Sequence, residues 1–374
     1  MALHHRPTLP RATRRVRAGA SFGPTMLRPF TITGAIVLGA GLVVATPTGL
    51  GQLPGSATVR DVTLAAGESD LLTPWIDQFN TTSQNATTLM NTFFEAPGIG
   101  WQQFIANMSG YLQDFFNDPT STTVTTVSQD MQAHLAAVLT GYGLQDASVK
   151  VQNVVEEHTL LDAGSLGESH RYIFGSLSEF LPSSINISQV QPILSFLGSP
   201  ESGIMMGILG PEISPWVALL NSVDAGDSFN ATLANMVGAY FNGSTLSLND
   251  LIPLIDQADV FPAGISLENI DIAFGGLLTP GDTTAGVGGS IFNSLGLELI
   301  GAPVIGQVDL TGEAVGPLGA LEGWAQALAT LLGWSGSGSP LADVTLPTVP
   351  TDFLDSGTAA ADLSSWMHDP LAAF

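Results

Sequence analysis

The spacing of apolar residues in the first half of the chain predicts helices. Thr73 followed by Pro74 matches a capping residue with proline at the first helical position, so a helix is expected from there to about Phe94. The proline and glycines at positions 97, 98 and 100 should end it.

A second predicted helix, residues 100–116, carries an aromatic stripe. Its apolar residues recur at intervals of three and four: Trp101, Phe104, Ile105, Met108, Tyr111, Leu112, Phe115 and Phe116. Such a stripe is typical of a helix that faces a core. The alternative is a lipid- or partner-facing surface, for which the candidates are Trp101, Phe104, Tyr111 and Phe115.

Further helices follow. A threonine-rich linker at 120–126 precedes a third helix that closes at Gly141 and Gly143. Beyond it we expect short helices that must pack together to be stable, at 153–161, 172–180, 189–196, 215–222, 231–242 and 249–258.

After Phe261 the period changes from helical to alternating. Short strands are predicted around residues 270–274, 295–299 and 308–310, and a last helix at about 317–332. Even four or five such strands would be too few for a monomeric membrane barrel. The expected fold class is therefore mainly α with a few short β-strands in the C-terminal third (α+β), made of short packed helices and not a monomeric β-barrel.

The pattern divides the chain into six segments. They are a signal peptide or signal anchor (1–45), a linker (46–69), an amphipathic helical region (70–145), a short-helix region (146–260), a mixed strand and helix region (261–333) and a Ser/Gly/Pro-rich tail (334–374).

The first segment is typical of an export signal. Six of the nine Lys and Arg residues precede an uncharged run at 30–45, and small residues at Val43 and Ala45 allow cleavage after Ala45. An uncleaved anchor is the alternative. After Ala45 we expect no helix that spans a membrane.

Charge is distributed very unevenly. All 33 acidic residues follow the leader, so a chain cut after Ala45 would carry 3 − 33 = −30 charges. This excludes nucleic acid as a partner, because nucleic-acid binding depends on neutralising phosphates. Only 11% of residues are charged and cysteine is absent, which suits either a neutral polar surface or contact with lipid.

Catalytic motifs are missing from the chain downstream of the leader. The one G-x-S-x-G run, at 19–23, lies inside the basic leader, and there is no P-loop or H-E-x-x-H. We therefore expect no enzyme and no cofactor. Acidic and histidine side chains gather at 156–171, where His158, Asp162 and His170 are the candidate metal ligands; a solvated, charge-paired corner is the favoured interpretation.

Four stretches carry a family resemblance. Residues 73–116, 196–222, 288–299 (GGSIFNSLGLEL) and 315–334 (VGPLGALEGWAQALATLLGW) resemble exported envelope proteins of mycobacteria and related actinobacteria, the outer-membrane porin A-like family named after a Gordonia cell-wall porin. The resemblance implies a water-filled, oligomeric channel in the mycolic-acid layer. It carries over no site residues.

Two functions are thus expected from the sequence. One is a porin-like protein of the cell envelope or outer membrane that conducts cations when oligomeric. The other is a secreted or envelope-attached interaction protein without catalysis. In both, envelope lipid or a homo-oligomer would be the partner.

Overall fold

The computed structural model describes residues 69–180, 186–258, 260–342 and 344–345. They all belong to one compact unit. The predicted leader, almost all of the 46–69 linker and most of the tail lie outside the described residues.

Three long helices open the described chain: α2 (Ser69–Glu95), α3 (Ile99–Asn117) and α4 (Ser121–Gly143). Two predicted boundaries are wrong. Helix α2 already includes Ser69, so Thr73 does not cap it, and Pro74 is accommodated inside the helix near its N-terminal end. The threonine-rich stretch is helical because Thr120 is the cap, its hydroxyl accepting a hydrogen bond from the Thr123 amide at 3.3 Å.

The helices that follow are mostly shorter, but one of them is long, and much longer than its pattern predicts. They are α5 (Val149–Thr159), η1 (Leu166–Glu168), α6 (His170–Gly175), α7 (Leu177–Phe180), α8 (Ile187–Leu197), α9 (Pro200–Ala225), α10 (Phe229–Asn242), η2 (Asn249–Leu251), α11 (Ile252–Gln257) and the final α12 (Pro317–Leu331). Only 215–222 of α9 was predicted, because Pro211 and Pro215 indicate a break. Tertiary packing keeps α9 helical through both prolines.

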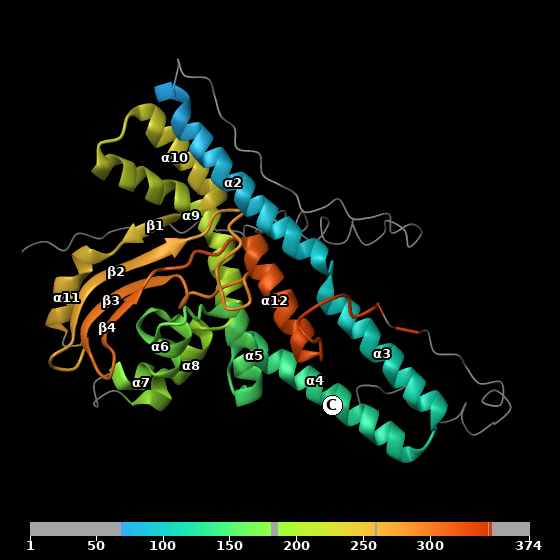
Figure 1. Cartoon of the computed structure of the whole chain (residues 1–374). Coiled ribbons are helices and arrows are strands. Elements are labelled where there is room, and N and C mark those ends of the chain that lie inside the picture. The colour runs from blue at the N-terminus through green and yellow to red at the C-terminus, as the bar shows by residue number, and fades with distance from the viewer. Residues whose placement is uncertain (1–68, 181–185, 259, 343, 346–374) are drawn as a thin grey trace, which may run out of the picture. The chain divides into compact units, whose positions relative to one another are not determined.

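The sheet is a small open one with antiparallel pairing throughout. Its order is β1 (Ser244–Ser247), β2 (Ser266–Phe274), β3 (Leu295–Ala302), β4 (Gly306–Leu310), as Figure 1 shows. The predicted mainly helical α+β class is confirmed. Strand β1 was missed; it precedes the expected strand region and has only four residues.

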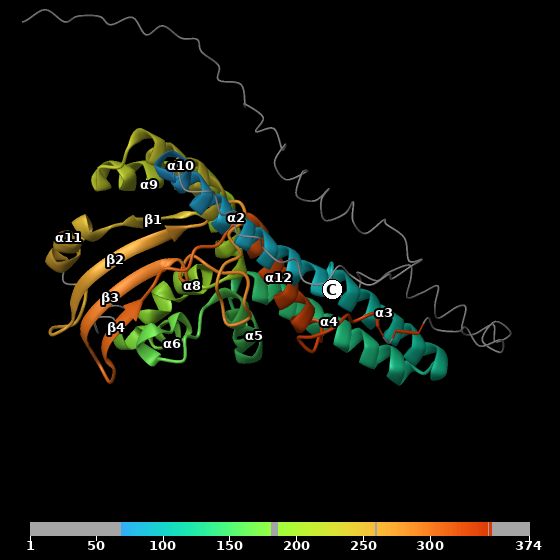
Figure 2. The same cartoon turned by 45° about the horizontal axis from the view of Figure 1, so that its top comes forward.

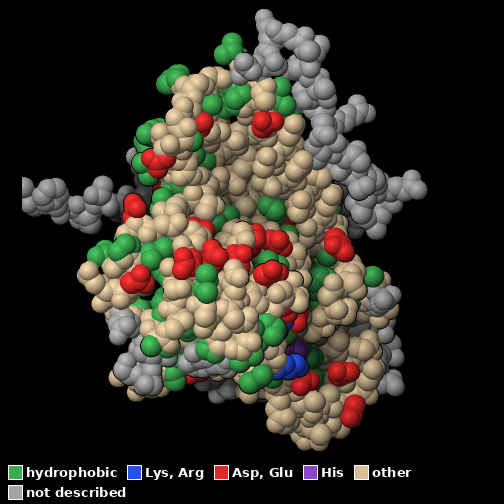
Figure 3. All heavy atoms as spheres, turned by 60° about the vertical axis from the view of Figure 1, so that its left-hand side comes forward, with side chains coloured by type: hydrophobic (Ala, Val, Ile, Leu, Met, Phe, Trp, Pro, Cys, Tyr) green, Lys and Arg blue, Asp and Glu red, His purple; other side chains and the backbone are tan. Residues whose placement is uncertain are grey.

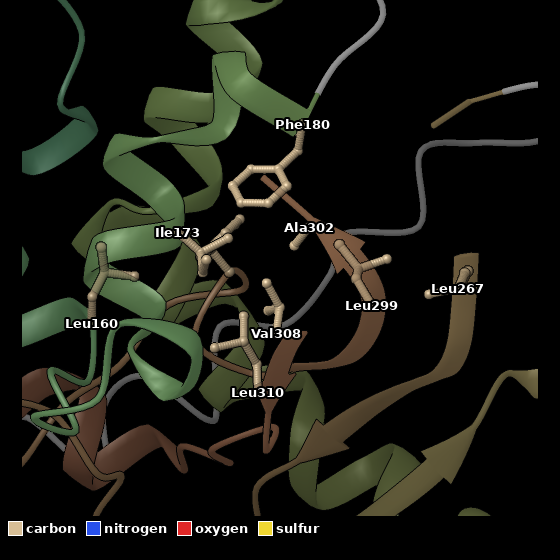
Figure 4. Packing of buried hydrophobic residues seen from close by; sticks show 9 residues of the cluster. Leu160, Ile173, Phe180, Leu267, Leu299, Ala302, Val308 and Leu310 are labelled. Atoms are coloured by element: carbon tan, nitrogen blue, oxygen red, sulfur yellow. The ribbon is translucent and has the colours of Figure 1, made fainter. Parts of the chain in front are cut away.

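One face of the sheet carries the largest apolar cluster. Leu299, Val308 and Leu310 from the sheet meet Ile173 and Phe180 from α6 and α7, as Figure 4 shows. Because successive side chains of a strand point to opposite faces, the residues next to these lie on the other face of the sheet. There, Glu298 is directly opposite Asp309.

Much of the connection between β2 and β3, residues 275–294, is buried and is held by polar contacts. Asn293, fully buried, accepts a hydrogen bond from the Leu161 amide at 2.8 Å and donates to the Asp282 carbonyl at 2.7 Å. Ser294 donates to the carbonyls of Ser290 and Glu313. These bonds offset the cost of burying a loop backbone.

Helix α9 lies against this interior backbone through a face of small residues. A Cβ at Gly203 or Gly210 would overlap the carbonyl oxygen of Gly289 or Gly275. Ser214, fully buried on the same face, donates to the carbonyl oxygens of Phe274 and Gly275 at 3.1 Å. Figure 2 shows α9 passing beside the sheet.

Helix α9 is also the one helix of the described chain with the length and apolar composition to cross a membrane. The expectation of no such helix after Ala45 therefore does not hold on length and composition. Many of its side chains are buried against the protein, and a core helix passes the same test.

Replacing Gly210 with alanine should destabilise the protein by about 1–3 kcal/mol, because the added methyl group overlaps the Gly275 backbone. Gly110→Ala is the matched control. Gly110 is an exposed residue of α3, and no atom lies near the place where its Cβ would stand, so this change should raise stability by about 0.5–1 kcal/mol. Urea unfolding measures both. Equal stability of the two variants would show that α9 is not in close backbone contact.

Candidate functional site

The histidine-rich corner does not form a ligand set. His158 is 7% exposed and His170 is fully buried. The His170 Nε2 lies 2.9 Å from the Leu295 carbonyl oxygen, while Asp162 accepts a hydrogen bond from the Ser169 hydroxyl. Within the described residues there is no group of three or more His, Asp or Glu side chains that could hold a metal.

Burial explains the state of both imidazoles. It lowers the pKa of His158 to about 4. It also lowers the pKa of His170, an effect that the hydrogen bond to Leu295 opposes. The expected solvated corner is wrong for these two residues. Its charge pairing is confirmed, since Arg171 lies 3.5 Å from Glu156 and 3.7 Å from Glu157.

The aromatic stripe of α3 borders a cavity instead of filling a core. Helices α3, α4 and α12, which pack on one another, border a half-open cavity of about 610 Å³. This volume is within the roughly 300–1,000 Å³ usual for small-molecule sites. Trp101 is 73% exposed and Phe104 is 45% exposed at its edge, so the expectation of a buried stripe is wrong.

The cavity wall is nearly all apolar. Among the described residues, no Asp, Glu, Lys or Arg contributes to it. Its lining residues are Gly98, Gly100, Trp101, Phe104, Asn107, Met108, Tyr111, Met131, His134, Leu135, Val138, Trp324, Ala325, Leu328 and Leu332. Three of the four predicted lipid- or partner-facing residues are therefore brought together here. The fourth, Phe115, lies outside the lining.

One polar pair stands in this wall. The Tyr111 hydroxyl lies 2.9 Å from the Nδ1 of His134. Burial and the nearby Asp130 carboxylate both raise the pKa of Tyr111. Asn107 is occupied by the protein itself, because it donates to the Leu332 carbonyl at 2.7 Å and accepts from Gln103 at 2.8 Å.

A second apolar feature lies on α9 and α10, which pack against each other. Their buried positions are mostly small residues, such as Gly203, Gly207, Ala234 and Gly238. Large apolar residues are exposed instead and recur at helical spacing: Met205, Leu209, Trp216, Leu220 and Val223 on α9, and Phe229, Leu233, Val237 and Tyr240 on α10. We call this set the α9/α10 face.

Two half-buried carboxyl groups have raised pKa values. Burial raises the pKa of Glu322, on α12, to about 8, and its Oε1 has no hydrogen-bond partner among the described residues. Burial, with Asp282 as a second cause, raises the pKa of Glu313 to about 7. Neither group stands in the cavity wall.

Comparisons of the chain with protein-family models, with curated proteins and with solved structures found no match.

Sequence reasoning missed two parts of these surfaces. His134 was not singled out, because a lone histidine in a helix gives no sign of a tyrosine partner 23 residues earlier. The α9/α10 face had a readable signal: small residues at 203, 207, 210, 214 and 218 share one side of a helix, which leaves the large apolar residues on the other.

Glu322→Gln should stabilise the protein at pH 8.5 and change little at pH 4.5. The folded-state pKa of about 8 exceeds the ordinary 4.5, so the folded chain retains a proton that the unfolded chain releases. The contribution of Glu322 to stability is therefore present below pH 4.5 and is lost as pH rises through about 8. Thermal unfolding at both pH values tests this, with Glu212→Gln on exposed α9 surface as control. An equal Tm difference at both pH values would contradict it.

Proposed function

We propose that this chain is an exported, non-catalytic envelope protein that binds apolar lipid material through its α9/α10 face. The observation that carries the proposal is the placement of side chains on α9, which is the reverse of that in a typical surface helix. Glycine and serine are buried, whereas Trp216 (64%) and Val223 (67%) are exposed. Small residues between helices and large apolar residues outside are typical of helices packed in lipid.

Exposing so many large apolar side chains to water is costly. Full burial of one such side chain contributes roughly 1.5–3 kcal/mol, and Phe229 alone is 85% exposed. An apolar face of this extent marks an interaction site on a soluble surface. Nine residues on two neighbouring helices belong to it, so a covering environment would stabilise the chain strongly.

Charge favours uncharged lipid over a second copy of the chain. Glu201, Glu212, Asp224 and Asp227 lie on or beside the face, and a second copy would bring the same charges into proximity. A hydrocarbon surface carries no such charge. The described residues offer only Lys150 and Arg171 as permanent cations, so anionic headgroups would be repelled rather than bound.

The sequence resemblance also supports a location in the cell envelope. The export leader and the stretches similar to porin A-like envelope proteins agree with a protein that contacts mycolate-type lipid. The absence of catalytic motifs downstream of the leader supports a binding role over an enzymatic one.

A cation-preferring channel is the second candidate, and acidic surface favours it. Figure 3 shows acidic side chains in a band across one face of the molecule. On the sheet, Glu298 pairs in register with Asp309, two like charges side by side. An aqueous path bordered by such residues would concentrate cations. It would require several copies of the chain arranged around a shared path.

The protein should bind vesicles of zwitterionic phosphatidylcholine, and the double substitution Trp216→Ser/Val223→Ser should weaken binding at least tenfold. Flotation on a density gradient measures it. The control is Val149→Ser/Val304→Ser, which alters two exposed valines outside the α9/α10 face and should leave binding unchanged. Binding that requires anionic lipid, or that survives the α9 substitutions, would refute the proposal.

If the protein conducts, its zero-current potential across a salt gradient in a planar bilayer should show cation preference. The preference should weaken between about 0.1 and 1 M salt, as the screening length falls from about 10 to about 3 Å. It should also weaken as pH approaches about 4 and carboxylates protonate. Anion preference would refute the charge argument, and absence of conductance would remove the channel candidate while leaving lipid binding intact.

A further inference from the structure

The polar groups in the wall of the cavity between α3, α4 and α12 are unevenly distributed. Tyr111 and His134 are close together and form one polar point in its wall. Gly100 lies against Leu328 of α12. It precedes Tyr111 by eleven residues on α3, which separates the two residues by about 16 Å along the helix axis. The wall between these points is apolar apart from Asn107. Along α3, the polar pair thus stands at the opposite end of the lining from Gly100, with mostly apolar residues between them.

The shape and chemistry of this space fit one extended hydrocarbon chain. Trp101, Phe104 and Leu135 line it and remain 73%, 45% and 41% exposed, so an apolar occupant would remove considerable apolar surface from water. Helices α3 and α12 lie close together at Gly100, where an added Cβ would overlap the Leu328 side chain.

The polar pair can satisfy a head group. The hydroxyl of Tyr111 both donates and accepts, and the second ring nitrogen of His134 has no hydrogen-bond partner among the described residues. Asn107 is a poorer partner for the head group, because its amide group is already hydrogen-bonded to Leu332 and Gln103. A hydroxyl or ester group would therefore find partners at Tyr111 and His134.

The charges around the cavity disfavour a ligand with a carboxylate or phosphate head group. The negative charge of Asp130 lies near Tyr111, and no Lys or Arg of the described residues lines the cavity. Arg171 is engaged with Glu156 and Glu157 on the histidine corner. An anion would enter a site without a counter-charge, whereas an uncharged head avoids that repulsion.

From this geometry we propose that the cavity binds a single-chain, uncharged amphiphile of the monoacylglycerol type. The acyl chain lies along α3 towards Gly100 and Leu328, and the hydroxyl or ester head meets Tyr111 and His134. This site is separate from the α9/α10 face and does not depend on it.

The test compares 1-monododecanoylglycerol with dodecanoate, both below their micellar concentrations, by calorimetric titration of the full chain at pH 8. We expect saturable binding of the glycerol ester at least tenfold tighter than of the carboxylate. Tyr111→Phe should reduce that preference several-fold while the protein keeps its fold. Equal affinity for the two probes, or no saturable binding of either, would overturn the proposal.

Cavity-filling substitutions locate the binding. Leu135→Trp should lower affinity at least tenfold, whereas Leu139→Trp, one turn along α4 and outside the lining, should leave it unchanged. Met108→Trp fills the same space from α3 and replaces Leu135→Trp in this experiment if that variant does not fold. Unchanged affinity in a folded filling variant would refute this site. Trp216→Ser/Val223→Ser should bind the ester normally even where it loses vesicle binding, which separates this proposal from the lipid-binding face.

Discussion

The close approach of α9 to the interior backbone is the contact on which the rest of the structure depends. At Gly203, Gly207 and Gly210 the helix lies so near the segments around Gly289, Gly316 and Gly275 that no side chain fits between them. These segments are the connection between β2 and β3 and the start of α12, so one helix fixes the sheet and the last helix together. The requirement for small residues on the inner side leaves α9 with its large apolar residues outside.

The interior that results is held by polar contacts as much as by apolar ones. The apolar core is divided into separate clusters, and fully buried Ser202, Ser214, Asn293 and Ser294 stand where a typical core has large hydrophobic side chains. Each of them donates or accepts hydrogen bonds with backbone groups. Such a network fixes one backbone arrangement, because any other would leave these groups buried and unpaired.

Two apolar features then remain at the surface, and their chemistry differs. The α9/α10 face is a set of large side chains on two packed helices, suited to an extended hydrocarbon environment. The cavity beside α3 is bounded on three sides and contains one tyrosine–histidine pair, suited to a single molecule. The described part of the chain has many acidic residues and few cations, which favours uncharged partners at both features.

The sequence by itself determined the helices with strong periodicity, the alternating strands, and the acidic, cation-poor character of the chain. Helices α3 and α12 agree closely with prediction because local spacing and breakers such as Pro97 and Gly333 act within a few residues. Strands β2 and β3 contain the predicted residues but are longer than predicted. Only the tertiary structure decided the full length of α9, because its prolines predict a break that packing against distant glycines overrides. Likewise, the stripe on α3 could belong to a core or a surface. Its outcome depended on how near α4 and α12 approach, and that distance is set by contacts between residues more than 200 positions apart, such as Asn107 and Leu332.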